Sequence, residues 1–218
     1  AERFVVGTPA RVSAPVADVL KEPAEGAGIN TQFLFGDDVL VFEAAGGFAW
    51  VQAERDGYVG YVRKDDIAER SGAPTHIVSV PRTFLYPGPD LRFPRAGELS
   101  MGSAVTVTGG AETRGTQYAV LEGGQAVIAN HLMPVADRAA DYVAVAETFL
   151  GTPYLWGGVS GFGIDCSGLV QLSMRMAGRD VLRDSDMQAA ALGVPFDPGV
   201  DFSGLRRGDL VFWKGHVA

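Results

Sequence analysis

The chain has 218 residues, of which 47% are hydrophobic, enough to bury the core of one large domain or of two or three small ones. Its 18 Lys and Arg against 26 Asp and Glu give a formal net charge of −8 at pH 7, with no basic block, so we expect no nucleic-acid partner. No apolar run is long enough to cross a bilayer, and the single cysteine rules out a disulfide within the chain.

An internal repeat marks the first 136 residues. Val-Ser-Ala-Pro at residues 12–15 recurs as Val-Ser-Val-Pro at 78–81, and residues 36–41 recur at 102–107, in both cases 66 residues later. Short alternating segments separated by Gly, Pro and Asp are typical of strands joined by turns. The repeat therefore predicts two copies of one small all-β barrel.

The two copies differ at polar positions. Asp37 of the first copy is replaced by Ser103 in the second, and Tyr58 and Tyr61 of the first have no tyrosine counterpart. A tyrosine in a strand is commonly a packing residue, and an aspartate in a turn commonly caps its own loop. Because a barrel that is only a spacer has no need of this difference, Asp37 and Tyr58 are also candidates for ligand contact.

A third unit follows a short linker at residues 134–137. Residues 140–150 carry apolar side chains at helical spacing and are predicted to form an amphipathic helix. We therefore expect an α+β chain with three units: small β-barrels at residues 1–72 and 73–136, and a larger domain at residues 137–218.

Cys166 follows a glycine-rich loop and begins an apolar segment of helical periodicity. Leu169, Leu172 and Met176 recur behind it at helical spacing, and Gly178 provides a stop signal. Unpaired N–H groups at the start of a helix stabilise a thiolate and can hold an oxyanion. A lone cysteine is commonly inert core filling, but Cys166 lies at the polar start of its segment, which favours a nucleophile.

A nucleophilic thiol requires an imidazole nearby. The chain has three histidines: His76, His131 and His216. Only His216 has suggestive surroundings, because residues 210–213 are predicted to form a strand, residues 214–215 a tight turn and residues 216–218 the start of another strand. We therefore expect Cys166 and His216 to pair. No second cysteine or close histidine pair suggests a metal site, and we expect no cofactor.

Four motifs together resemble the catalytic domain of the NlpC/P60 cysteine peptidases. They are Tyr-Leu-Trp-Gly-Gly at 154–158, Asp-Cys-Ser-Gly at 165–168, Arg-Gly-Asp-Leu-Val-Phe-Trp at 207–213 and Gly-His-Val-Ala at 215–218. The resemblance implies a papain-like core in which a cysteine-bearing helix packs against an antiparallel sheet that carries the histidine. It also implies that the substrate is a peptidoglycan peptide.

The two repeats resemble bacterial SH3 domains, through residues 34–37 and 56–62 above all. Two such barrels before this core resemble the γ-D-glutamyl-L-diamino acid endopeptidases. That branch implies hydrolysis of the bond between γ-D-Glu and the L-diamino acid in free murein peptides with an N-terminal L-Ala, during cell-wall recycling. We expect a cytoplasmic monomer, with a periplasmic or wall-associated location left open because the chain lacks an initiating Met.

The resemblance also assigns roles to residues. Cys166 attacks the scissile carbonyl, His216 transfers the proton and the Tyr154 hydroxyl approaches the carbonyl oxygen. Asp37 and Tyr58 hold the free amine of the L-alanine. Further substrate-binding candidates lie around the nucleophile or in the subsite for the N-terminal part of the peptide: Trp156, Asp165, Ser167, Asp184 and Ser185.

Ser185 and Gln188 have a structural interpretation beside the functional one. Their spacing fits a capping box, in which the serine caps a helix and the glutamine side chain returns to the serine backbone N–H. The apolar residues 189–192 that follow agree with a helix there.

Three points remain open at this level: whether the catalytic domain is complete, and two other functions. The family places a third polar residue beyond the histidine, and the sequence ends at Ala218, so we expect the catalytic domain to be incomplete at its C-terminus. A murein-peptide binding protein without catalysis would also fit the sequence, as would a thiol acyltransferase on the same fold.

Overall fold

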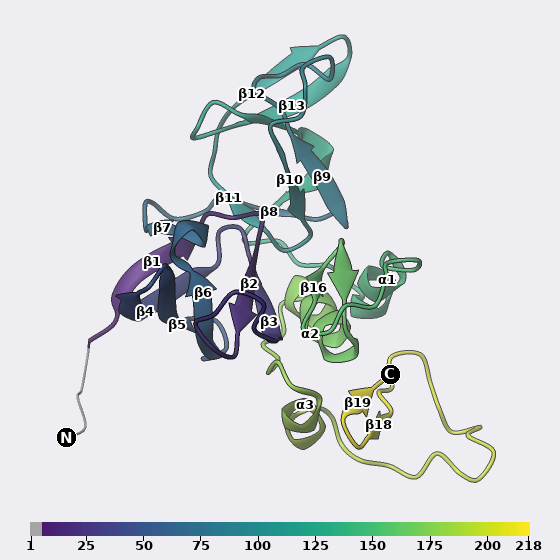
Figure 1. Ribbon diagram of the computed structural model, residues 1–218. Coiled ribbons are helices and arrows are strands. Elements are labelled where there is room, and N and C mark those ends of the chain that lie inside the picture. Colours follow the sequence, from purple (N-terminus) through teal and green to yellow (C-terminus); the bar gives the residue numbers. More distant parts are fainter. Residues whose placement is uncertain (1–5) are drawn as a thin grey trace.

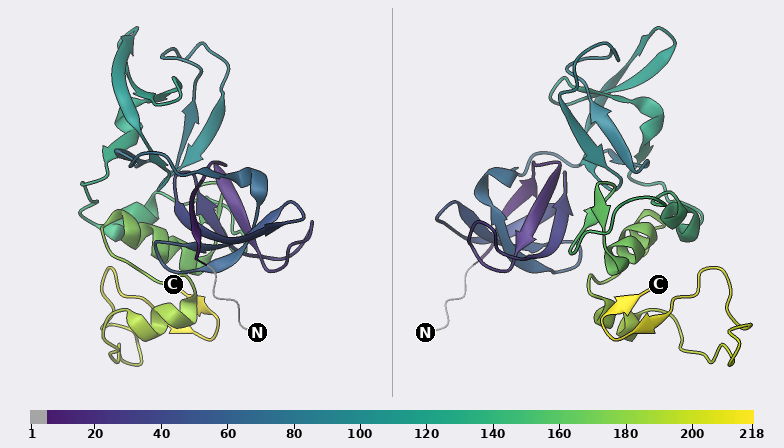
Figure 2. Two further views of the ribbon diagram at one scale, coloured as in Figure 1. Left: turned by 90° about the vertical axis from the view of Figure 1, so that its left-hand side faces the viewer. Right: turned by 45° about the vertical axis from the view of Figure 1, so that its right-hand side comes forward.

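The computed structural model describes residues 6–218, which form two groups of strands and then a unit that combines helices with short hairpins. Figure 1 shows the second group of strands above the first, the helices beside the first group, and the C-terminal hairpin furthest from the second group. Both views in Figure 2 show the same separation. The mixed content, with strands concentrated in the N-terminal part, agrees with the expected α+β organisation.

The first group of strands forms one antiparallel sheet. Its strands are β1 (Thr8–Val12), β2 (Val16–Leu20), β3 (Ile29–Leu34), β4 (Asp38–Ala45), β5 (Phe48–Ala53), β6 (Val59–Arg63) and, after a 3₁₀ turn at Lys64–Asp66, β7 (Ile67–Glu69). Their spatial order is β3-β2-β6-β5-β4-β1-β7. Alternate side chains point inward, and the core includes Val12, Val19, Phe33, Val39, Val51 and Val62, each at most 1% exposed.

The second group of strands forms three smaller antiparallel sheets. Its strands are β8 (His76–Val78), β9 (Arg82–Leu85), β10 (Gly97–Ser100), β11 (Ala104–Val105), β12 (Val107–Thr113), β13 (Thr116–Leu121), β14 (Ala126–Ile128) and, after a 3₁₀ turn at Ala129–His131, β15 (Leu132–Pro134). They pair as β10-β9, β11-β8-β15 and β12-β13-β14. Val78, Leu99, Val105 and Val127 lie at the centre of a separate apolar core.

The same tight turn occurs in both groups, 66 residues apart in the sequence. Gly36 donates its backbone N–H to the Val12 carbonyl, and Gly102 donates its N–H to the Val78 carbonyl, both across 2.9 Å. Both glycines have φ in the left-handed region, at 84° and 87°, where a side chain would be strained. The sequence repeat therefore corresponds to a repeat in backbone structure.

The third unit contains three helices and two short hairpins. Its elements are α1 (Tyr142–Glu147), β16 (Val159–Ser160), β17 (Gly163–Ile164), α2 (Cys166–Met176), α3 (Ser185–Ala191), β18 (Phe212–Trp213) and β19 (His216–Val217). Strand β16 pairs with β17, and β18 pairs with β19. Helix α2 ends where Gly178, at φ 77°, was expected to stop it.

Helix α1 is shorter than the sequence periodicity predicts. It begins at Tyr142 because the Asp141 side chain caps it by accepting the Val143 N–H, and after Glu147 the backbone continues as turns. Leu150, expected on the buried stripe, is 85% exposed. The expected helix over residues 140–150 is therefore wrong in length, although its position is correct.

One apolar cluster joins the three units. Leu34 of the first group and Met101 of the second pack with Phe149, Leu172 and Met176 of the third. All five side chains are at most 5% exposed. Burial of this extent fixes helix α2 against both groups of strands, since separating the units would expose a continuous apolar surface.

Polar contacts add specificity to this junction. The Val159 N–H donates to Gln32 Oε1 across 3.2 Å, and the Gly161 N–H donates to Ser100 Oγ across 2.8 Å. Both acceptors are buried, so hydrogen bonding offsets the cost of removing them from water. None of the helices in the part of the chain that the structure describes is long and apolar enough to cross a membrane.

Candidate active site

A cavity of about 540 Å³ lies between helices α1 and α2 and the β18–β19 hairpin. Cys166 of α2, His216 of β19 and Tyr154 of the loop before β16 all line it. The fold thus brings the three predicted catalytic residues to one cavity, although His216 lies 50 residues after Cys166 in the sequence. Apolar side chains such as Phe149 and Leu169 form much of the remaining wall.

Cys166 is the first residue of α2, and its thiol is half-buried. Asp165 is the N-cap residue, and its Oδ1 accepts the Gly168 N–H across 2.7 Å. Its Oδ2 accepts the Gly157 N–H across 2.9 Å, so one carboxylate fixes both the preceding loop and the first helical turn. The sulfur therefore lies at the positive end of the α2 dipole on a fixed backbone.

His216 lies on a short hairpin, as the sequence predicts. It pairs with Trp213 across the turn formed by Lys214 and Gly215, and Gly215 has φ 76°. The His216 and Trp213 rings lie 4.7 Å apart between centroids, tilted by 46°. The hairpin and the neighbouring indole together restrict the imidazole beside the cavity.

Tyr154 lies on the cavity rim and is 60% exposed. Its backbone forms a single parallel β-bridge with Ile164, which aligns the loop with β17. Partial burial of the hydroxyl and its closeness to Cys166 raise the pKa of Tyr154. The hydroxyl therefore keeps its proton and can donate to an oxygen next to the sulfur.

Asp165 and Ser167 flank the nucleophile, but their polar groups are engaged within the protein. Arg183 donates to Asp165 Oδ1 and Oδ2 across 3.1 and 2.7 Å and to Ser167 Oγ across 2.7 Å. Asp165 is 8% exposed, Ser167 is 6% exposed and Arg183 is 3% exposed. This arrangement supports the helix start, and the predicted substrate contacts of Asp165 and Ser167 remain predictions.

Tyr58 of the first barrel and Asp184 meet at the edge of the third unit. Burial and the adjacent Asp184 carboxylate raise the pKa of Tyr58. Burial raises the pKa of Asp184 as well, against the opposing effect of Arg183. A half-buried carboxylate beside a phenol can bind an ammonium group, because the ammonium would restore a compensating charge.

The capping box predicted for Ser185 and Gln188 is wrong. Helix α3 begins at Ser185, so the N-cap residue is Asp184, and no side chain caps it. The fully buried Gln188 amide donates instead to the carbonyls of Ser167 and Leu182, across 3.0 and 2.9 Å. Gln188 thus ties α3 to the first turn of α2, which leaves the half-buried Ser185 next to Asp184.

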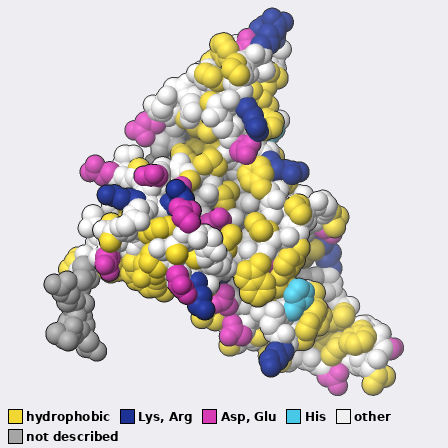
Figure 3. All heavy atoms as spheres, viewed as in Figure 1, with side chains coloured by type: hydrophobic (Ala, Val, Ile, Leu, Met, Phe, Trp, Pro, Cys, Tyr) yellow, Lys and Arg dark blue, Asp and Glu magenta, His cyan; other side chains and the backbone are white. Residues whose placement is uncertain are grey.

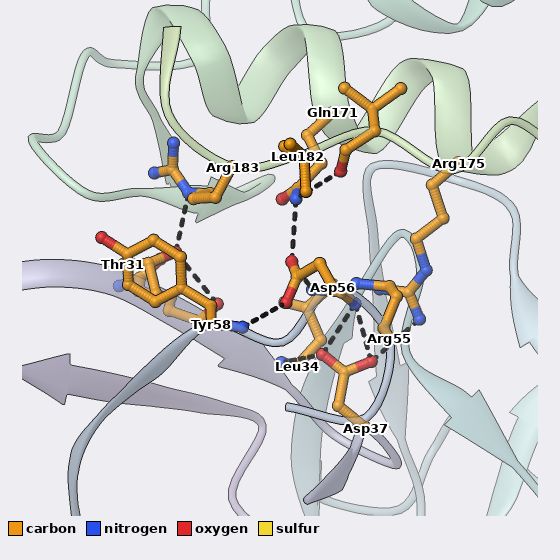
Figure 4. Close-up of polar contacts among 12 residues, drawn as sticks. Thr31, Leu34, Asp37, Arg55, Asp56, Tyr58, Gln171, Arg175, Leu182 and Arg183 are labelled. Atoms are coloured by element: carbon orange, nitrogen blue, oxygen red, sulfur yellow. Dashed lines mark hydrogen bonds and ion pairs between the residues drawn. The ribbon is translucent and has the colours of Figure 1, made fainter. Parts of the chain in front are cut away.

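Asp37 does not extend over the cavity, so that expectation is wrong. Its carboxylate accepts hydrogen bonds from Arg175 of α2 at 2.8 Å, from Arg55 at 3.0 and 3.1 Å and from the Leu34 N–H at 2.9 Å, as Figure 4 shows. Burial alone would raise the pKa of Asp37, but the two guanidinium groups outweigh it and lower that pKa. The charge joins the first barrel to α2 and is not available to a substrate.

Trp156 does not line the cavity, and its indole is 70% exposed. The following residue, Gly157, lies against Ile29 and Asn30 of the first barrel, which directs this loop along the barrel edge. A substrate contact by Trp156 therefore stays a prediction without support from the cavity geometry.

Sequence analysis missed the polar residues that connect the units. Arg183 donates to Thr31 Oγ1 across 2.7 Å, and Gln171 donates to Asp56 Oδ2 across 2.9 Å. Arg175 is the third such residue. For Gln171 and Arg175 the available signal was only that polar residues interrupt the apolar periodicity of residues 166–176, and Arg183 lies outside that segment.

Charged side chains are dispersed over the face viewed in Figure 3, where Lys and Arg lie singly among acidic and hydrophobic groups. Within residues 6–218, no group of three His, Cys, Asp or Glu side chains is placed to hold a metal ion. The cavity itself brings together a thiol, an imidazole, a phenol and a helix N-terminus.

Comparison with known proteins gives two family matches. Residues 19–67 match the bacterial dipeptidyl-peptidase SH3 domain, and residues 151–218 match the NlpC/P60 family. Over 200 residues the chain is 31% identical to a gamma-D-glutamyl-L-lysine dipeptidyl-peptidase of Bacillus subtilis, covering 85% of this chain and 64% of that protein. A Bacillus cereus protein of the same name is 28% identical over 212 residues, with 85% and 60% covered.

The chain thus spans just under two thirds of the length of these curated relatives. Among solved structures, an NlpC/P60 family protein from Bacillus cereus superposes with a TM-score of 0.78 at 22% identity, covering 97% of this chain and 86% of the other. The order of the strand groups, the helices and the hairpin is therefore a fold shared with that protein.

Proposed function

We propose, from the match of residues 151–218 to the NlpC/P60 family and of residues 19–67 to a bacterial SH3 domain, that the protein is a cysteine endopeptidase acting on free murein peptides. It hydrolyses the bond between γ-D-Glu and the L-diamino acid of peptides with an N-terminal L-Ala. The observation that carries the proposal is that Cys166, at the start of α2, and His216, on the hairpin, line one cavity. The names of the curated relatives support this bond as the target.

The reaction has two steps. His216 accepts the thiol proton of Cys166, and the thiolate attacks the carbonyl carbon of the γ-amide. The Cys166 N–H and the Tyr154 hydroxyl donate to the oxyanion. The C–N bond then breaks, the imidazolium gives its proton to the leaving amine, and a thioester remains on Cys166.

Water completes the cycle. His216 removes a proton from a water molecule that attacks the thioester carbonyl, the C–S bond breaks, and the sulfur recovers its proton from the imidazolium. The products are L-Ala-D-Glu, with a free γ-carboxylate, and the part of the peptide that begins with the diamino acid. Every proton passes through His216, so its position at the cavity wall is as important as that of Cys166.

The subsite for the N-terminal amine consists of Tyr58, Asp184 and Ser185. Asp184 carries the negative charge that an ammonium group requires, and Tyr58 lies against it from the first barrel. Because Asp37 is engaged with arginines, the first barrel contributes Tyr58 and not Asp37 to this subsite. A peptide whose amine is blocked by an amide would place a neutral group against a half-buried carboxylate, and it binds poorly for that reason.

The three units are residues 1–72, 73–136 and 137–218. The turn repeated at Gly36 and Gly102 supports an SH3-like origin for the second group of strands as well as the first. The first barrel shapes the amine subsite, and the second supports the junction through Met101 and Ser100. We further propose that the protein is a monomer that acts on released peptides in cell-wall recycling in the cytoplasm, with a periplasmic or wall-associated location as the alternative.

Product identification by mass spectrometry tests this function. The purified wild-type protein is incubated with L-Ala-γ-D-Glu-L-diamino acid peptides and with their N-acetylated counterparts. The Cys166→Ala variant is incubated with the same peptides in separate reactions. We expect L-Ala-D-Glu only from the free-amine peptide and only with the native cysteine. Cleavage by Cys166→Ala, or equal cleavage of the acetylated peptide, would contradict the proposal; transfer of the acyl group to an added amine would indicate an acyltransferase.

A further inference from the structure

The guanidinium group of Arg183 contacts the first barrel and both residues that flank Cys166. Its Nε donates to Thr31 Oγ1 across 2.7 Å, and its two Nη atoms donate to Asp165 and Ser167 across 2.7 to 3.1 Å. Arg183 is 3% exposed. A fork of donors held in this way has a single orientation, because any rotation would break several charge-assisted bonds at once.

The opposite side of the Asp165 carboxylate is equally occupied. Oδ1 accepts the Gly168 N–H and Oδ2 accepts the Gly157 N–H, so the carboxylate holds the loop before Cys166 and the helical turn after it. Arg183 fixes this carboxylate from the other side. The backbone on both sides of the sulfur is thereby attached, through one ion pair, to Thr31 on the first barrel.

The ion pair also affects charge at the nucleophile. A carboxylate next to a thiol opposes formation of the thiolate, and a guanidinium group bound to both carboxylate oxygens offsets that effect. Removal of Arg183 would leave a buried carboxylate beside Cys166 without a cation. The thiolate would then form only at higher pH.

We propose that Arg183 is a positioning residue for Cys166. Arg183 holds the Asp165 cap in the geometry that favours the thiolate, and its hydrogen bond to Thr31 makes that geometry depend on docking of the first barrel. The inference rests on the proposed function only for the role of Cys166 as nucleophile. Its test measures the thiol itself, so it gives a result whether or not the proposed peptide is the substrate.

Arg175 provides a matched control. Like Arg183 it connects the first barrel to the third unit, but it does so through an ion pair with Asp37, and it lies nine residues after Cys166 on α2. If Arg183 acts only by holding the units together, loss of either arginine has the same effect on the thiol. If Arg183 acts through Asp165, only its loss changes the pH dependence of the thiol.

The experiment is alkylation by iodoacetamide as a function of pH. Cys166 is the chain's one cysteine, so every labelled protein molecule, counted by intact mass, reports on this residue. The wild type is compared with Arg183→Met, Arg183→Lys, Thr31→Val and Arg175→Met. Circular dichroism shows which variants are folded at each pH.

We expect Arg183→Met to move the alkylation midpoint upward and to slow labelling at pH 7 about tenfold, as a shift of one pH unit would. Arg183→Lys, which keeps the charge but cannot reach both Asp165 oxygens and Thr31 together, shows a smaller shift in the same direction. Thr31→Val also shows a smaller shift, since it frees only one edge of the guanidinium group. Arg175→Met keeps the wild-type midpoint.

Three results would overturn the proposal. They are a wild-type midpoint in folded Arg183→Met, a shift in Arg175→Met as large as that in Arg183→Met, and wild-type profiles in both Arg183→Lys and Thr31→Val. The profiles of Arg183→Lys and Thr31→Val test the proposal even if Arg183→Met does not fold.

Discussion

Arg175, on the helix that carries Cys166, donates a 2.8 Å hydrogen bond to Asp37 of the first barrel, and Arg55 contacts the same carboxylate from within the barrel. Two guanidinium groups therefore share one carboxylate that is 7% exposed. Arg175 and Asp37 meet near the C-terminal end of α2, away from Cys166, and connect the first barrel to this helix. Figure 4 shows both arginines directed at Asp37.

Asp37→Asn should destabilise the protein by about 3 kcal/mol, because it removes the carboxylate shared by two largely buried cations and leaves only Asp56 beside Arg55. Urea unfolding followed by circular dichroism measures the change. The control is Glu25→Gln, which removes an exposed partner of Arg63 and should cost about 0.5 kcal/mol or less. Equal losses in the two variants would mean that the Asp37 cluster contributes no more than a surface pair.

Stability should fall in acid through the same residue. Burial opposes ionisation of Asp37, but Arg175 and Arg55 outweigh it, so the pKa of Asp37 is lowered from its usual value of 3.8. The unfolded chain then binds a proton more readily than the folded one. The contribution of Asp37 is complete above pH 3.8 and is lost as the pH falls through the lowered pKa.

The free energy of unfolding, measured by urea titration from neutral pH into this acid range, checks the sign of the Asp37 effect. The wild type should lose more stability on acidification than Asp37→Asn, whose amide does not titrate. Parallel losses in the two proteins would show that other carboxylates account for the acid dependence.

Asp184→Asn should weaken recognition of a free N-terminal amine. The amide keeps the shape of the side chain but removes the charge next to Tyr58, so KM for a free-amine peptide rises about tenfold or more while the rate with saturating peptide changes less. Burial raises the pKa of Asp184, so its carboxyl group becomes fully ionised at a higher pH than usual. Binding of the free-amine peptide by the wild type should therefore strengthen as the pH rises through that range.

Steady-state kinetics against pH, with peptides of free and acetylated amine, measure this effect. The Asp184→Asn protein should lose the acid limb of the KM profile for the free-amine peptide and show little change with the acetylated one. An unaltered acid limb would assign it to a different group.

Gly36→Ala should disrupt the junction between the first two units. Gly36 has φ 84°, and a Cβ there would collide with the Ala104 backbone, so strain and collision add. Gly26 has a similar φ of 78° but open space around it, and Gly26→Ala therefore isolates the cost of strain alone. Thermal unfolding should show a clearly larger decrease in Tm for Gly36→Ala than for Gly26→Ala. Equal decreases would mean that the two units move apart enough to accommodate the added methyl group.

Much of the cavity could be predicted from the sequence, because its residues belong to contiguous motifs. Cys166 begins a helix after a glycine-rich loop, and His216 follows a two-residue turn, so local patterns locate both. The repeated barrel turns were accessible in the same way, since only glycine tolerates the backbone at Gly36 and Gly102.

The connections between units could not be predicted in this way. Asp37 was interpreted as a ligand contact from the difference between the two copies and from the family resemblance, and its actual partner Arg175 is 138 residues away and carries no motif. Gln188 was assigned to a cap on its own helix, whereas it donates to the Ser167 carbonyl 21 residues earlier. Long-range polar contacts depend on how preformed units dock, and local sequence patterns contain no information about that step.

The central claim is that His216 and Cys166 act as one pair. The most direct test is the pH dependence of Cys166 alkylation in the wild type, in His216→Ala and in the control His76→Ala, whose ring hydrogen-bonds Thr75 beside the second group of strands. An imidazolium at the cavity stabilises the thiolate, so we expect His216→Ala to raise the midpoint and to slow labelling near pH 7 about tenfold or more, with His76→Ala unchanged. A His216→Ala profile identical to that of the wild type would contradict the account.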